Sequence, residues 1–103
     1  MSGKKIETVF DKQEDGRDYY KGLAEGHQAL WVSIRTGAKL EEIENSFGLL
    51  INQVRGRRTP TQQGTHHNWR AEHVILDFYD PNVSNDAAIE FLEQVIEMIR
   101  DRQ

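Results

Sequence analysis

The chain of 103 residues contains no cysteine. This absence excludes disulfides, thiolate nucleophiles and metal centres with cysteine ligands, and it fits a reducing compartment. No apolar run approaches the roughly 18 residues that a membrane span requires. The first residues, Met-Ser-Gly-Lys-Lys, also lack the apolar stretch of a signal peptide. We therefore expect a cytoplasmic protein without a membrane segment.

Hydrophobic residues are few, at 37% of the chain, whereas 29% of the residues are Asp, Glu, Lys or Arg. A chain of this length has the size of one domain and hides about two-thirds of its extended surface on folding. Its apolar residues fall into periodic groups, which argues against disorder. We predict a single domain over residues 1–103, with a thin core between two layers.

Two segments have the periodicity of amphipathic helices. The first, over residues 38–54, has an apolar stripe of Leu40, Ile43, Phe47, Leu50, Ile51 and Val54. Thr36-Gly37 is expected to cap its start. The last helix has a stripe of Ala88, Phe91, Leu92, Val95, Ile96 and Ile99, with Ser84, Asn85 or Asp86 as its cap. Glutamates occupy the other faces of both helices.

Alternation of apolar and polar residues predicts strands over residues 28–35 and 71–79. Residues 5–11 also fit a strand, and residues 17–25 fit either a strand or a short helix. Asp15-Gly16 favours a hairpin turn between them. The predicted fold is α+β: a small two-layer sandwich of about four mainly antiparallel strands in the order βββαβα, with two amphipathic helices on one sheet face.

A basic, polar segment follows the first helix. No acidic residue lies between Glu44 and Glu72, and the rest of the chain holds nine basic residues against all 17 acidic ones. The groups suited to an anion, such as a phosphate, are Arg55, Arg57, Arg58, Thr61, Gln63, His66, His67, Trp69 and Arg70. Arginine donates paired hydrogen bonds, and the tryptophan offers a ring for stacking on a base. The segment also fits a plain polar connection.

The histidines suggest a metal site only weakly. His66, His67, His73 and Glu72 are suitable ligand types, but their spacing matches no metal motif, and in a strand Glu72 and His73 would point to opposite faces. We predict neither a metal nor a cofactor. The pair His73 and Asp77 is a weak signal for acid–base chemistry. Recognised catalytic motifs are absent from the sequence, so we favour a non-enzymatic protein.

The sheet face opposite the helices is a second candidate surface, because two helices cannot cover both faces of a sheet. Alternation places on it Trp31, Ser33, Arg35, His73, Asp77 and Tyr79. Tyr19 or Tyr20 can extend this surface. An exposed aromatic face usually binds a partner or a ligand, and a second copy of the chain is the partner we expect first.

Two functions are consistent with these features. The first is a ligand-binding module whose basic segment, residues 55–70, binds a nucleotide or another phosphate-bearing small molecule, or single-stranded RNA. Duplex DNA is not expected, because the net charge of −4 repels a large polyanion. The alternative is a protein-interaction domain, such as an inhibitor, immunity or adaptor protein, whose aromatic sheet face and acidic helices bind a basic partner.

Overall fold

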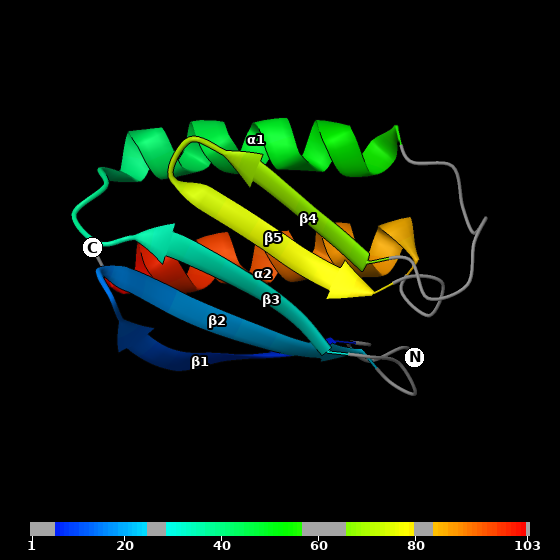
Figure 1. The fold of residues 1–103 in the computed structure, drawn as a ribbon, viewed down its shortest axis with the longest axis horizontal. Coiled ribbons are helices and arrows are strands. Elements are labelled where there is room, and N and C mark those ends of the chain that lie inside the picture. The colour runs from blue at the N-terminus through cyan, green and yellow to red at the C-terminus, as the bar shows by residue number, and fades with distance from the viewer. Residues whose placement is uncertain (1–5, 25–28, 57–65, 80–83, 103) are drawn as a thin grey trace.

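The computed structural model describes residues 6–24, 29–56, 66–79 and 84–102. The elements along the chain are β1 (Ile6–Glu14), β2 (Arg17–Ala24), β3 (Ala29–Arg35), α1 (Leu40–Arg55), β4 (His66–Ala71), β5 (Val74–Tyr79) and α2 (Asn85–Arg102). The strands form one antiparallel sheet in the order β1-β2-β3-β5-β4. Both helices lie on the same face of this sheet, and Figure 1 shows α2 behind the strands. The predicted α+β class is thereby confirmed.

The second half of the sheet differs from the prediction. The segment expected as one strand over residues 71–79 is a hairpin, in which Glu72 and His73 form a turn between β4 and β5. Glu72 has a φ of 49°, in the left-handed region that such tight turns require. Glutamate is not a typical turn residue, so the sequence carries no clear signal for this turn. The described strands therefore number five, and residues 17–24 form a strand rather than a helix.

Of the predicted hairpin turn and the two predicted helix caps, the turn and one cap are confirmed. Asp15 and Gly16 have φ values of 55° and 76° and form the predicted hairpin turn. The hydroxyl of Ser84 accepts a hydrogen bond from the Ala87 N–H (3.1 Å) and caps α2. The cap expected at Thr36-Gly37 is wrong, because α1 starts three residues later and the Lys39 N–H donates to Glu42 Oε1 (2.9 Å).

The core lies between the sheet and the helices. α1 packs on β4 and β5, α2 packs on β1, β2 and β3, and the two helices contact each other. Leu30, Val32 and Ile34 of β3 face the helices, as the alternation predicts. The fully buried side chains also include Tyr20, Leu50, Val54, Val74, Leu76, Phe78, Phe91, Leu92 and Val95. Each large apolar side chain buried in this way contributes roughly 1.5–3 kcal/mol to folding. Neither α1 nor α2 is long and apolar enough for a bilayer span.

Candidate interaction surface on the open sheet face

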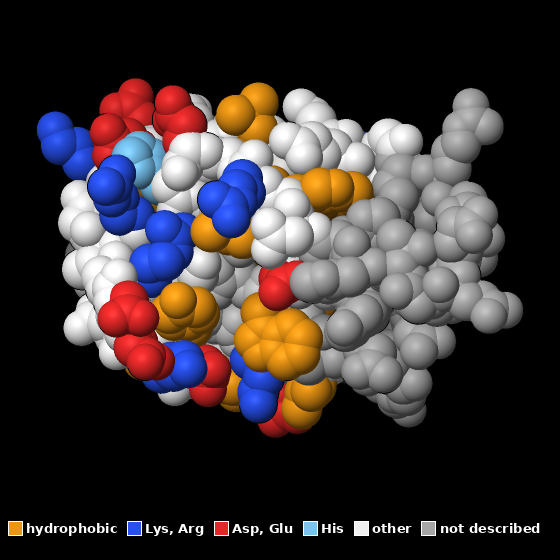
Figure 2. Space-filling view, in the orientation of Figure 1, with side chains coloured by type: hydrophobic (Ala, Val, Ile, Leu, Met, Phe, Trp, Pro, Cys, Tyr) orange, Lys and Arg blue, Asp and Glu red, His pale blue; other side chains and the backbone are white. Residues whose placement is uncertain are grey.

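The sheet face that both helices leave uncovered is called the open face below. It consists of the described side chains that alternate with the core-facing residues of the five strands. In Figure 2, Lys and Arg side chains lie across this face among hydrophobic ones. Trp31, Ser33 and Asp77 belong to it as predicted, with Trp31 opposite Asp77 and Ser33 opposite Ile75 in the β3–β5 register. Alternation within β3 and β5 was therefore sufficient to find this part of the surface.

A hollow of about 200 Å³ lies in the middle of the open face. Its lining residues are Arg17, Tyr19, Trp31, Val32, Ser33, Ile75 and Asp77. Ser33 sits at the centre of the row, because β2 pairs it with Tyr19 and β5 pairs it with Ile75. A serine side chain is much smaller than these neighbours, so it leaves a depression between them. Ser33 itself is only 7% exposed.

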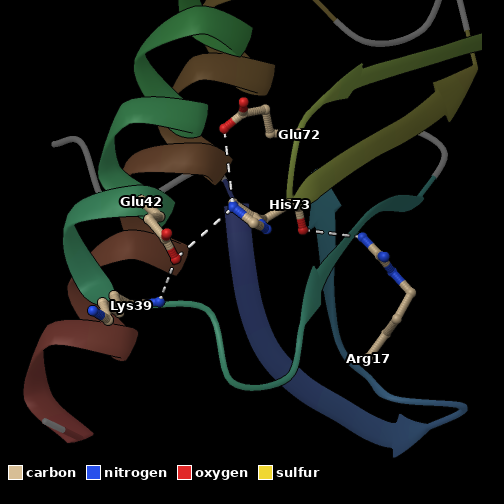
Figure 3. Close-up of polar contacts among 5 residues, drawn as sticks. All are labelled: Arg17, Lys39, Glu42, Glu72 and His73. Atoms are coloured by element: carbon tan, nitrogen blue, oxygen red, sulfur yellow. Dashed lines mark hydrogen bonds and ion pairs between the residues drawn. The ribbon is translucent and has the colours of Figure 1, made fainter.

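Arg17 of β2 lies across this face and connects β2 with β3 and with the β4–β5 turn. Its Nε donates to Ser33 Oγ (2.9 Å), and its Nη2 donates to the carbonyl oxygens of Ser33 (3.2 Å) and His73 (3.1 Å). The bond to the His73 carbonyl is visible in Figure 3. Within the described part of the chain, Arg17 has no carboxylate at ion-pair distance, and its Nη1 has no acceptor. The guanidinium is therefore held in place while part of its hydrogen-bonding capacity is unused.

The charge of the open face is opposite to that of the rest of the described molecule. The strand register places five cationic residues on the face, which are Lys12, Arg17, Lys21, Arg35 and Arg70, and Lys12 is placed there by the register shift that leaves Asp11 without a strand partner. The same register places Glu7, Glu14 and Asp77 on it, and Glu14 is paired with Lys12 at 3.0 Å. Even if Asp11 is added, five cationic residues stand against four acidic ones. The other described residues hold four Lys or Arg against twelve Asp or Glu. The sheet side is thus net positive, and the helix side is strongly negative.

The prediction that places His73 on the open face is wrong. His73 is a turn residue whose imidazole points toward the start of α1, with Nε2 3.8 Å from Glu42 Oε1 and 3.9 Å from Glu72 Oε1 (Figure 3). The prediction that Glu72 and His73 point to opposite faces of a strand is therefore also wrong, because both residues lie in a turn, where their side chains come close to each other. The turn also removes the basis for a His73–Asp77 acid–base pair, since Asp77 lies on β5.

The structure separates the described members of the predicted anion site. Arg55 ends α1, whereas Arg70 lies beside the β4–β5 turn at the end where α1 begins (Figure 1). The helix from Glu42 to Arg55 alone rises by about 20 Å. Trp69 faces the helices, and its ring packs edge-on against Phe78 with 5.9 Å between centroids. Arg55, Arg70 and the Trp69 ring therefore do not form one site.

The remaining members of that site lie outside the described residues. They are Arg57, Arg58, Thr61 and Gln63, together with the side chains of His66 and His67. The side chain of Tyr79, predicted for the open face, is likewise outside the described part. Binding of a phosphate-bearing ligand by residues 55–70 stays a prediction. Among the described residues, no group of three or more histidine or acidic side chains is placed to hold a metal ion.

Sequence reasoning missed one important member of the open face, Arg17. Its role depends on the β2–β3 register, which brings residue 17 beside Arg35 and lets its side chain reach Ser33. Of the two tyrosines expected to extend this surface, Tyr19 lines the hollow, whereas Tyr20 is buried in the core. Comparison of the chain with protein-family models, with curated proteins and with solved structures finds no match.

Proposed function

We propose that this chain is a protein-interaction domain whose open face binds an acidic surface of another protein. The observation that carries the proposal is a cationic, hollowed sheet face on a molecule whose other described residues are mainly acidic. Complementary charge speeds encounter and selects among partners. The charge also revises the expected partner of this face, because a net positive surface favours an acidic protein over a basic one.

The size and chemistry of the hollow favour a protein over a nucleotide or RNA. A volume of about 200 Å³ is below the range of roughly 300–1,000 Å³ typical of small-molecule pockets. A row of stacked bases needs free aromatic faces, but Lys12 Nζ lies 5.4 Å from the centre of the Tyr19 ring.

A second copy of the chain is a less suitable partner for the same face. In a two-fold dimer the open face would pack against itself. Two net positive surfaces would then meet, and like charges brought together at an interface are costly. The acidic partner is therefore the better match for the charge that the described residues place on this face.

Peptides selected from a random display library on the wild-type chain test the proposal. We expect selected peptides to be acidic and to shift amide NMR signals of β2, β3 and β5. Arg70→Glu is expected to weaken their binding about tenfold, because it reverses a charge on the open face. The matched control is Arg55→Glu, which makes the same charge change on an exposed arginine at the end of α1 and is expected to change the affinity less than about twofold.

Equal loss in the two variants, or signal shifts confined to α1 and α2, would contradict the proposal. An oligouridylate strand serves as the second probe in the same assay. Binding of that strand with the same dependence on Arg70 would replace the protein partner by single-stranded RNA.

A further inference from the structure

We infer that the hollow over Ser33 is an anchor site for one apolar side chain of an extended acidic segment, and that a carboxylate of the same segment binds Nη1 of Arg17. This inference rests on the proposed function and specifies the partner's chemistry. Interfaces commonly derive most of their affinity from a few side chains that fill pockets near the centre of the contact. The hollow is at the centre of the sheet and has room for one such side chain.

The walls of the hollow define the apolar half of the ligand. Tyr19 and Ile75 flank Ser33 on the neighbouring strands, and Trp31 lies two residues along β3 on the same face. An aromatic or branched aliphatic side chain placed there contacts three large apolar surfaces. Its burial removes apolar area from water and thereby favours binding. A polar side chain would gain much less from the same position.

Arg17 defines the charged half of the ligand. Its three hydrogen bonds to Ser33 and to the His73 carbonyl fix the guanidinium before any partner arrives. Ordering of a long side chain is a cost of binding, so a side chain that is already ordered reduces this cost. A carboxylate at Nη1 would form a charge-assisted hydrogen bond without breaking the three existing bonds.

The two halves lie close enough for a single short segment. Nε of Arg17 donates to Ser33 Oγ, so the guanidinium adjoins the hollow directly. In an extended chain, side chains two residues apart project from the same side at a spacing of about 7 Å. We therefore infer a segment of the form acidic residue, any residue, apolar residue.

Synthetic peptides provide a test that does not depend on a natural partner. The probe is acetyl-Gly-Asp-Ser-Phe-Gly-amide, followed by NMR with the labelled wild-type chain. We expect saturable shifts at Tyr19, Trp31, Ser33 and Ile75. Replacement of the peptide's Phe by Ala, or of its Asp by Asn, is expected to weaken binding about tenfold each. Since these changes are in the peptide, they cannot unfold the protein.

Three protein variants address the anchor site itself. Ser33→Leu fills the hollow and is expected to abolish binding, whereas Ser33→Thr keeps the hydroxyl that accepts from Arg17 and is expected to weaken it by a smaller factor. In Arg17→Lys, the Asp and Asn peptides are expected to bind with nearly the same affinity, because the directed Nη1 donor is gone. The amide spectrum of each variant reports whether its fold is retained.

Three outcomes overturn the inference: no shifts at about 5 mM wild-type probe, equal binding of the Phe and Ala peptides, or undiminished binding by folded Ser33→Leu. If library peptides still lose affinity in Arg70→Glu, the proposed function stands and only the anchor is wrong. If Arg70→Glu has no effect either, both fail.

Discussion

At the scale of single residues, two small residues of the sheet, Gly22 and Ser33, have different consequences because they face opposite sides of it. Gly22 faces α2, where the Phe91 ring packs so closely on the strand that an added Cβ would lie 2.7 Å from Cε1 and still nearer to Cδ1. Ser33 faces away from the helices, where Arg17 and the larger side chains of the neighbouring strands surround it and leave a hollow between them. The first small residue allows a dense core, and the second leaves a depression on the surface.

Gly22→Ala should therefore destabilise the protein by about 1–3 kcal/mol, because a fully buried ring must move to accommodate the methyl group. Gly48→Ala is the matched control. Gly48 is in α1, and a Cβ there meets open space, so the same change should stabilise the protein by about 0.5–1 kcal/mol through helix propensity. Urea unfolding of the three proteins measures both effects. A neutral Gly22→Ala would show that Phe91 has room to shift.

At the scale of elements, periodicity was enough to predict both helices and the strand β3. The stripes of α1 and α2 agree with the buried positions of each helix. β4 could not be predicted in this way, because Trp69 is the one large apolar residue between His66 and Ala71, and the following turn has no glycine or asparagine. The contribution of Arg17 to the site was also hidden, since it depends on pairing between strands and not on spacing within one.

The start of α1 is connected to the β4–β5 hairpin through Glu42. Its carboxylate accepts from the Lys39 N–H (2.9 Å) and lies 3.8 Å from His73 Nε2. Glu42→Ala should cost about 0.5–2 kcal/mol, as expected for loss of a helix cap. Glu41→Ala, an exposed change in the same turn, should stay within about 0.5 kcal/mol. Thermal unfolding compares the two. Equal destabilisation would show that helix-dipole charge, and not the cap, is the relevant contribution.

At the scale of the whole molecule, the described positive and negative side chains gather on opposite sides of the domain. The helix layer carries most of the described acidic residues, and the sheet side carries most of the cationic ones. An approaching acidic protein is repelled by the first and attracted by the second over distances of about 10 Å at ordinary salt. Under the proposed function, this field would orient the acidic partner toward the open face before contact.

The same charge distribution predicts a monomer in solution, in place of the dimer that the uncovered face first suggests. Packing two open faces together would oppose five cationic residues with five more. Among the described residues of this face, Lys12 alone lies within ion-pair distance of a carboxylate, that of Glu14 at 3.0 Å. Size-exclusion chromatography with light scattering should give the mass of one chain at low and moderate salt. If a dimer forms, Ser33→Leu and Arg70→Glu locate its interface. If both variants disrupt the dimer, a second copy of the chain, and not an acidic partner, binds the open face. If neither variant affects the dimer, the dimer uses another surface, and the open face stays accessible to the proposed partner.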